Sequence, residues 1–207
     1  MRVEHKHSEW ADRGAHANAY AHRVLAVVPV KGLNGAKSRL AAVFSPEARA
    51  DLVRAMLTNV LAACAASRAI EQVLLVTPEP ELAPDGVDVL VDAGTGHDAA
   101  VADALADPRT RAGALVLMAD VPLVRPDSLD RLASAAAPVA LAPARDGGMN
   151  AFAFRGELGF EPAFGVPDAA NVTLERARAI GVEATVVDDP LLALDFDRPG
   201  DIAALVP

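Results

Sequence analysis

The chain has little of several features that mark common protein classes. One cysteine, Cys64, among 207 residues excludes an internal disulfide bond and suits a reducing cytoplasm. Aromatic residues make up only 4% of the chain, while hydrophobic residues of all kinds make up 52%, which favours small aliphatic side chains packed in an α/β domain over an aromatic recognition surface. Because no apolar run approaches the ~20 residues that cross a bilayer, we expect no membrane span.

Basic residues are also scarce. Lys and Arg number 19 against 28 Asp and Glu, which gives a formal net charge of −9. Non-specific binding to nucleic acid or to an anionic membrane needs a basic surface, so we expect neither partner. An acidic protein that handles phosphates must gather its few cations in one place or recruit a divalent metal ion.

The first 23 residues differ from the rest of the chain. They hold four of the five histidines among mixed charges, and they lack the apolar centre of a signal peptide. Such histidines could be read as a metal site, but the polar composition favours a disordered extension. We therefore expect residues 1–23 to be an N-terminal extension and residues 24–207 to form one domain.

From Val24 onward, apolar runs of strand length alternate with helical patterns. Alternation of this kind predicts a single-domain, three-layer α/β/α fold with a mainly parallel sheet, and such sheets bind ligands at the carboxyl ends of their strands. The predicted strands are 24–30, 72–77, 87–92, 114–119, 139–144, 150–154, 182–187 and 192–196, and the predicted helices are 46–67, 98–106, 126–136, 171–181 and 199–205.

The most informative segment is VLAVVPVKGLNGAKSRL, residues 24–40. An apolar strand leads into a loop with two glycines and two lysines, and a helix start follows at Ser38. Glycines let backbone N–H groups approach an anion, a helix N-terminus adds a favourable dipole, and lysines supply charge. The spacing is neither that of a P-loop nor that of a dinucleotide fingerprint. The pattern alone leaves two alternatives, phosphate binding and an ordinary turn with two solvated lysines.

Acidic residues follow two of the predicted strands. Asp120 leaves the carboxyl end of an apolar strand just before Val121-Pro122, where it is either a ligand-binding acid or a turn residue. Asp195 and Asp197 alternate along a predicted strand, so their side chains point to one face and repel unless they share a cation or face water. Magnesium prefers oxygen ligands, commonly one or two carboxylates plus substrate phosphates.

Residues 24–40 also resemble the N-terminal signature of the guanylyltransferases of coenzyme F420 biosynthesis, which join GMP to 2-phospho-L-lactate or phosphoenolpyruvate. The resemblance implies a Rossmann-like nucleotidyltransferase with GTP as donor, a small phosphorylated acid as acceptor and Mg²⁺ as cofactor. It extends to about residue 206 through LVLMADVPLV (115–124), DGGMNAF (146–152), PAFG (162–165) and LALDFDRPGDI (192–202).

The resemblance also implies roles for single residues on the nucleotide side. Asp120 would bind the metal ion together with Asp195 or, as second choice, Asp197. Lys31 and Lys37 would steady the triphosphate, and with Asp120 they form the implied catalytic set. The other implied nucleotide contacts are Pro29, Val30, Gly32, Gly94, Gly96 and Asp98.

Asp98 stands near the nucleobase loop, where the family usually carries Gly-Leu-Asn and this chain has Gly96-His97-Asp98. Its carboxylate could accept hydrogen bonds from guanine N1–H and N2–H, or it could cap the following helix. The departure from the family pattern leaves both interpretations open.

The acceptor side departs further from the family. Met149 replaces a hydroxyl residue, and Asp168 stands where a serine is usual. A thioether cannot donate a hydrogen bond, and an ionised Asp repels an acceptor carboxylate. The implied acceptor contacts are Gly147, Gly148, Met149, Asn150, Phe164, Gly165 and Asp168.

The main expectation is thus GMP transfer from GTP to phosphoenolpyruvate or 2-phospho-L-lactate. One alternative is a related transferase with another acceptor, such as 3-phosphoglycerate, or another nucleotide. A second is a non-catalytic nucleotide-binding paralogue, against which the retained acids and Lys37 argue. The sequence leaves the oligomeric state open, and it places the enzyme in the cytoplasm.

Overall fold

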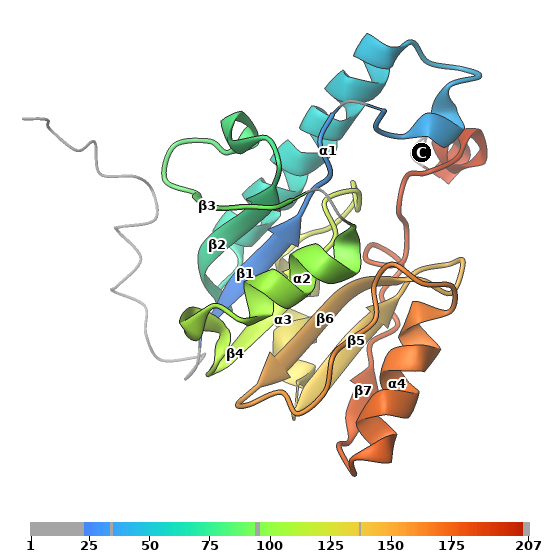
Figure 1. Cartoon of the computed structure of the whole chain (residues 1–207). Helices are drawn as coiled ribbons and strands as arrows, with labels where there is room; N and C mark the ends of the chain where they lie inside the picture. The colour runs from blue at the N-terminus through green and yellow to red at the C-terminus, as the bar shows by residue number, and fades with distance from the viewer. Residues whose placement is uncertain (1–22, 34, 94–95, 137, 205–207) are drawn as a thin grey trace, which may run out of the picture.

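A computed structural model describes residues 23–33, 35–93, 96–136 and 138–204 (Figure 1). The predicted extension lies outside the described residues except for Arg23, whose guanidinium donates to the carbonyl of Ile70 over 2.6 Å. The described strands are β1 (Val24–Pro29), β2 (Ile70–Thr77), β3 (Asp88–Val91), β4 (Gly113–Leu117), β5 (Val139–Pro143), β6 (Met149–Arg155) and β7 (Ala184–Val186). The described α-helices are α1 (Pro46–Ala66), α2 (His97–Leu105), α3 (Pro126–Ala135) and α4 (Ala169–Ala179).

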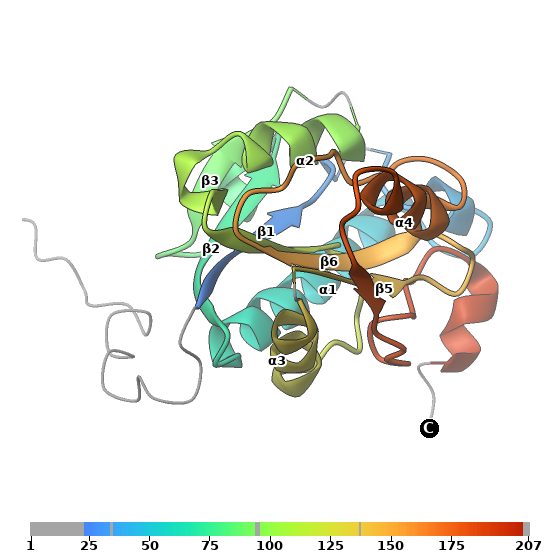
Figure 2. The ribbon, with the colours of Figure 1, turned by 90° about the horizontal axis from the view of Figure 1, so that it is seen from below.

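The strands form one sheet in the order β3-β2-β1-β4-β6-β5-β7. Every pair is parallel except the two that β6 makes, with β4 and with β5. Helices α2 and α4 cover one face of the sheet, and α1 and α3 cover the other (Figure 2). The predicted three-layer α/β/α fold with a mainly parallel sheet is confirmed.

The strand order reverses beside β1. From β1 the chain moves outward to β2 and β3, and it then returns to place β4 on the other side of β1. The carboxyl ends of β1 and β4 therefore open onto a topological switch point, which is where open α/β sheets bind ligands.

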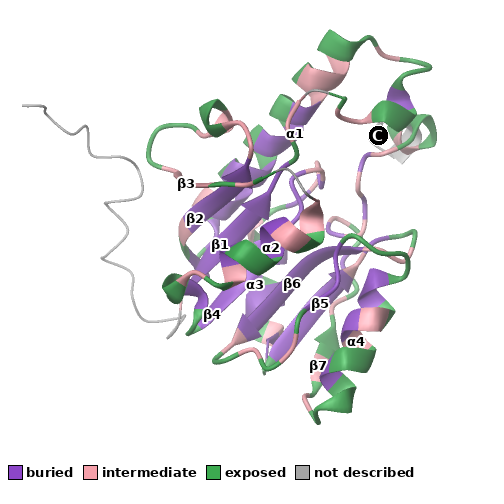
Figure 3. Cartoon of the chain, viewed as in Figure 1, coloured by how far each residue is buried: buried purple, intermediate pink, exposed green. Residues whose placement is uncertain are grey.

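Local sequence explains why these elements form. All residues of β1 and β4 are buried, as expected for central strands covered on both faces (Figure 3). Helix α1 begins as predicted, because the Ser45 hydroxyl accepts from the backbone N–H of Ala48 over 3.2 Å and Pro46 occupies the first helical position.

The predicted strand at 192–196 is wrong: the structure has a turn at Leu192, a bend at Ala193 and irregular chain after them, and none of these residues pairs in the sheet. A backbone group of this segment makes a hydrogen bond outside the sheet, because the N–H of Phe196 donates to the carbonyl of Asp120 over 3.1 Å. The alternation nevertheless assigned the faces correctly, because Leu192, Leu194 and Phe196 are buried while the two aspartates between and after them are partly exposed.

The closing helix also differs in kind from the prediction. Pro199–Ala204 is a 3₁₀ helix, and further short 3₁₀ turns lie at Ser38–Leu40, Pro80–Leu82 and Pro108–Thr110. Asp201 lies in its first turn and accepts from the N–H groups of Asp197 and Arg198 over 2.9 and 2.6 Å. In the described part of the chain, no helix has the length and apolarity needed to cross a membrane.

Candidate active site

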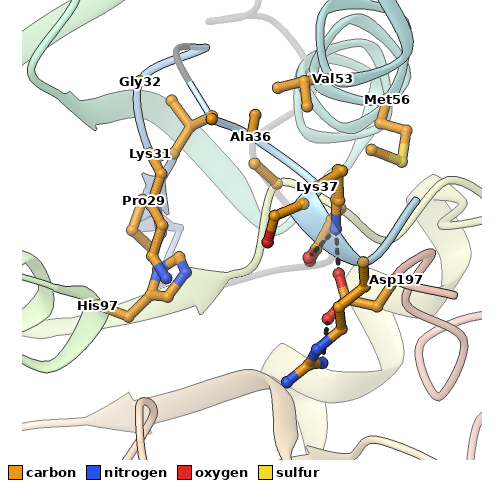
Figure 4. A pocket seen from close by; sticks show the side chains of 15 residues that line it. Pro29, Lys31, Gly32, Ala36, Lys37, Val53, Met56, His97 and Asp197 are labelled. Carbon is orange, nitrogen blue, oxygen red and sulfur yellow. Dashed lines mark hydrogen bonds and ion pairs between the residues drawn. The ribbon is translucent and has the colours of Figure 1, made fainter. Parts of the chain in front are cut away.

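A cavity of about 340 Å³ lies at the switch point between β1 and β4. Its wall comes from the loop after β1, two residues of α1, the start of α2, the end of β4 and Asp197 of the C-terminal segment. Figure 4 places Lys31 and His97 on one side of this cavity and Lys37 and Asp197 on the other. Pro29, Val30 and Gly32, which the sequence assigned to the nucleotide, also lie on the wall.

Lys37 joins the loop after β1 to the two acids predicted to bind metal. Its Nζ lies 2.6 Å from Asp120 Oδ2 and 2.5 Å from Asp197 Oδ1. Burial lowers the pKa of Lys37, but the two carboxylates raise it by more, so its pKa lies above the ordinary value. Asp197 also pairs with the Arg39 guanidinium over 3.0 Å. The sequence prediction thus brought together residues that are 83 and 160 positions apart.

The backbone of Lys37 is in the left-handed region, with φ 49° and ψ 44°. A residue with a Cβ pays about 1–2 kcal/mol for this conformation, and such residues persist where the surrounding structure holds them. Here the ammonium is fixed by two carboxylates at its far end. The left-handed backbone and the two ion pairs together hold this side chain in one place.

The loop between β1 and Lys37 is fixed by Glu79, which the sequence analysis missed. Glu79 Oε1 accepts from the N–H of Leu33 over 2.9 Å. A Cβ on Gly32 would lie 2.7 Å from the same oxygen. Gly32 is therefore needed so that Glu79 can reach the loop backbone. A contact between positions 46 residues apart leaves no local signal in the sequence.

Gly32→Ala is expected to loosen this loop. The new methyl group displaces the Glu79 carboxylate and leaves the Leu33 N–H without its acceptor, which costs about 1–1.5 kcal/mol, or roughly a tenfold rise in the KM for the nucleotide. Steady-state kinetics measure this change. Gly200→Ala is the matched control, because a Cβ there meets no atom within 4 Å. An unchanged nucleotide KM in Gly32→Ala would show that the Glu79 contact does not organise the loop.

Asp195 lies near Asp120 but is not paired with Lys37. Burial raises its pKa most, and the charges of Asp120, Asp146 and Asp197 raise it further. The pKa of Asp197 moves the other way, because Lys37 and Arg39 outweigh the effect of its burial. The surroundings of Asp195 thus raise its pKa, while those of Asp197, two residues later, lower its pKa.

Asp195→Asn is expected to stabilise the ligand-free protein. It removes an ionised, crowded carboxylate, and a gain of about 1 kcal/mol raises the Tm of a chain of this size by roughly 2–4 °C. The gain is present above the raised folded-state pKa of Asp195 and shrinks as the pH falls through it. Thermal melting from pH 7 to pH 4 measures this trend.

Asp197→Asn is the matched comparison for that experiment. It removes the partner of Lys37 and Arg39, so its Tm should fall at neutral pH. Equal shifts of the same sign in the two variants would contradict the assignment of opposite environments.

The three acids assigned to metal do not form one closed site. Among the described residues, no three His, Cys, Asp or Glu side chains converge closely enough to hold a metal ion by themselves. The side chains of Asp120 and Asp197 remain 27% and 31% exposed beside the cavity. Two carboxylates that leave positions open for substrate oxygens match the way Mg²⁺ is commonly bound beside phosphates.

His97 is a second residue that the sequence analysis did not assign to the site. It is the first residue of α2, directly after Gly96, whose φ of 129° requires glycine. Burial lowers the pKa of His97 most, and Lys31 and Lys37 lower it further against the opposing charges of Asp120 and Asp98. These surroundings favour the neutral imidazole. The sequence signal for a role of His97 was its position after a strand and a glycine-bearing loop. Gly94, which the sequence assigned to the nucleotide, lies in that loop and outside the described residues.

Asp98 does not cap α2, because the N-cap position belongs to Gly96, and it does not line the cavity. Its Oδ1 instead accepts from the N–H groups of Phe164 and Gly165, over 2.7 and 3.0 Å. The nucleotide-side and acceptor-side segments of the sequence prediction are therefore joined directly.

The acceptor-side loop lies at the same edge of the sheet as Asp120. Because β6 runs antiparallel to β4, its first residues lie beside the end of β4, and the N–H of Met118 donates to the carbonyl of Asn150 over 2.9 Å. The Asn150 amide donates to the carbonyl of Leu192 over 2.9 Å, and the Met149 side chain is only 3% exposed. Acceptor contacts from this loop would therefore come from its backbone.

Gly147 and Asp168 face each other across the acceptor side. Asp168 has φ 56°, and its Oδ1 accepts from the Asn171 amide over 2.8 Å and lies 3.5 Å from where a Cβ on Gly147 would be. Gly148 lies in the same turn, where its N–H donates to Asp146 over 3.1 Å. These residues are brought together by the fold, although none of them lines the cavity beside Lys37.

Comparison with known proteins identifies the family of this chain. Residues 24–206 match the family described as "Guanylyl transferase CofC like". The phosphoenolpyruvate guanylyltransferase of Sphaerobacter thermophilus is 38% identical over 191 residues, which cover 87% of this chain and 91% of that protein. The 2-phospho-L-lactate guanylyltransferase of Haloarcula marismortui is 39% identical over 185 residues, covering 86% and 83%. The 3-phospho-D-glycerate guanylyltransferase of Phenylobacterium zucineum is 38% identical over 190 residues, covering 85% and 86%.

The fold also has solved counterparts. A putative nucleotide-diphospho-sugar transferase from Desulfovibrio desulfuricans G20 superposes with a TM-score of 0.67, at 21% identity over 89% of this chain and 86% of that one. At this identity the likeness concerns the fold alone. The family match over nearly all of the described domain is the stronger finding, and it means that this chain belongs to the CofC-like guanylyl transferases and is a nucleotidyltransferase.

Proposed function

We propose that the protein transfers GMP from GTP to phosphoenolpyruvate or 2-phospho-L-lactate, releases pyrophosphate and serves coenzyme F420 biosynthesis in the cytoplasm. The observation that supports this most is Lys37, held between Asp120 and Asp197 at the ends of β1 and β4 in a chain of this family. That position offers cations for a triphosphate and carboxylates for a metal ion within one cavity.

The reaction forms one bond and breaks one. A phosphate oxygen of the acceptor attacks the α-phosphorus of GTP, and the bond from the α-phosphorus to the bridging oxygen breaks, so that pyrophosphate leaves with the electron pair. The acceptor oxygen is already ionised at neutral pH, so no general base and no covalent enzyme intermediate is required. Catalysis then comes from positioning and from stabilising the charge that moves to the leaving group.

The cavity supplies cations for that charge. Lys37 lies across the cavity from Lys31, with Arg39 near the same acid as Lys37 (Figure 4). Lys37 would hold the triphosphate close to the two carboxylates, while Lys31 binds it from the opposite wall. Positive charge fixed in advance on both sides of the leaving group lowers the barrier without reorganisation in the transition state.

The residues present fit a magnesium ion. Asp120 with Asp195 or Asp197 offers hard oxygen ligands, and a cation there would relieve the crowding that raises the pKa of Asp195. Asp120 with Asp195 or Asp197 would hold the ion, and its positive charge would neutralise charge on the substrate phosphates. The amine of Lys37 would then be free to contact the phosphates in place of the acids.

A second candidate acceptor is 3-phospho-D-glycerate, the substrate named for the Phenylobacterium zucineum relative. Asp168 favours it, because a carboxylate on the acceptor side can accept a hydrogen bond from the hydroxyl of phosphoglycerate. Phosphoenolpyruvate has no such hydroxyl and cannot make this hydrogen bond, whereas the carboxylate that Asp168 repels is present in both acids.

Pyrophosphate release across a matrix of substrates tests the proposal. GTP, ATP, CTP and UTP are each paired with phosphoenolpyruvate, 2-phospho-L-lactate and 3-phospho-D-glycerate in the presence of Mg²⁺. GTP with one of the first two acids should give the highest kcat/KM. Preference for phosphoglycerate would establish the second candidate, and no release with any pair would contradict guanylyl transfer.

A further inference from the structure

Asp98 makes an unusual contact for a residue in the first turn of a helix. One of its oxygens, Oδ1, accepts from two consecutive backbone N–H groups, those of Phe164 and Gly165, over 2.7 and 3.0 Å. The other oxygen, Oδ2, would lie 3.0 Å from a Cβ at Gly165. Asp98 is exposed, and its Oδ1 is engaged by the backbone of residues 164–165.

The segment that Asp98 holds has two further anchors. The N–H of Ala163 donates to the Thr173 hydroxyl of α4 over 2.9 Å. The Phe164 ring packs edge-on against Phe152 of β6, with centroids 6.4 Å apart and an interplanar angle of 86°. These two anchors, on α4 and β6, lie on the acceptor side of the site, among the elements that follow β5. Asp98 ties the segment to α2, which contacts β1 and β2 in the nucleotide half.

The neighbour of Asp98 makes this tie relevant to the reaction. His97, one residue earlier, lines the cavity with Lys31 and Lys37. A movement at the start of α2 must therefore shift both the wall of the cavity and the backbone of residues 163–165. One charge-assisted contact connects the two sides of the site.

We infer that Asp98 is a positioning residue that holds segment 163–165 against the first turn of α2 and so fixes the acceptor side relative to the nucleotide cavity. The inference rests on the proposed guanylyl transfer. Asp98 touches neither substrate, and it acts through the backbone of Phe164 and Gly165. Its loss should therefore weaken use of the acceptor and leave binding of the nucleotide unchanged.

Kinetics of three variants test the inference. Asp98→Ala removes the carboxylate that accepts two hydrogen bonds from the backbone of residues 164–165. It is therefore expected to raise the KM for the acceptor substrate about tenfold or more, while the nucleotide KM stays within about twofold of wild type. Asp98→Asn should restore most of the loss, because its amide oxygen can accept from the same two N–H groups. Asp103→Ala is the control, an exposed acid on the same helix.

A double-mutant cycle locates the effect at Gly165. Gly165→Ala places a methyl group 3.0 Å from Asp98 Oδ2 and should raise the acceptor KM by itself. In the Asp98→Ala background the carboxylate is absent, so Gly165→Ala should raise the acceptor KM by less than a further twofold. Additive effects would mean that Gly165 acts independently of Asp98.

Hydrogen exchange tests the contact without substrates. The amides of Phe164 and Gly165 should exchange at least tenfold faster in Asp98→Ala than in wild type or Asp103→Ala, while the Tm stays close to that of the control. If exchange responds but no acceptor is used, the proposed function fails and the contact stands. Unchanged exchange, or a loss of nucleotide binding at unchanged acceptor KM, would overturn the inference.

Discussion

Asp120→Asn is expected to lower kcat/KM about 10³-fold or more, equivalent to roughly 4 kcal/mol of transition-state stabilisation, with the fold intact. The amide keeps the size of the side chain, and the backbone carbonyl of residue 120 still accepts from Phe196. What is lost is a negative oxygen that faces Lys37 at the end of a buried strand. The kinetics of pyrophosphate release and a thermal melt measure the two effects separately.

Asp85→Asn is the matched control for this variant, because Asp85 is exposed in a loop away from the cavity. It should behave as wild type in both measurements. Asp120→Asn with near-normal turnover would remove Asp120 from the catalytic set. A large fall in its Tm would instead assign the acid a role in folding.

Removal of the Lys37 ammonium should cost about 10²–10³-fold in kcat/KM, because it takes away the buried cation between two acids. Two substitutions separate chemistry from backbone strain. Lys37→Ala keeps a Cβ at φ 49°, whereas Lys37→Gly relieves the strain. Both variants should lose the same activity, yet Lys37→Gly should be more stable than Lys37→Ala by about 1 kcal/mol.

Denaturant unfolding of the two variants, together with their turnover, checks this prediction. Arg54→Ala is a suitable control for the loss of a cation, since its ion pair with Asp51 is exposed on α1. Equal stability of the Ala and Gly variants would mean that the left-handed backbone of residue 37 is not maintained. Higher activity in Lys37→Gly than in Lys37→Ala would mean that loop geometry matters more than the charge.

Local signals were enough to predict the elements that carry the site. The β-branched run of β1, the Ser45-Pro46 helix start and the apolar β4 each have the composition their structure needs, and the strand ends follow from them. The alternation of Leu194, Asp195 and Phe196 was also sufficient to place the acids on one face, although the segment has no strand partner.

Two contacts between distant segments, unlike the meeting of Lys37 with Asp120 and Asp197, were beyond the sequence patterns. The tie from Glu79 to the loop at Gly32, and that from Asp98 to Phe164, join elements whose relative position depends on the whole sheet. No propensity or spacing within a window of residues reports such a pairing. Asp98 illustrates the consequence, since its type and its place after a glycine loop suited a base contact or a helix cap, while in the structure it accepts from the backbone of Phe164 and Gly165 and does not occupy the cap position.

Labelled GTP tests the central claim most directly. Wild-type protein is incubated with Mg²⁺ and the preferred acid, once with label at the α-phosphate and once with label at the γ-phosphate, and the products are separated. The α-label should appear in the product joined to the acid and the γ-label in pyrophosphate, with neither formed by Asp120→Asn. Transfer of the γ-label to the acid, or equal product from Asp120→Asn, would contradict guanylyl transfer at this cavity.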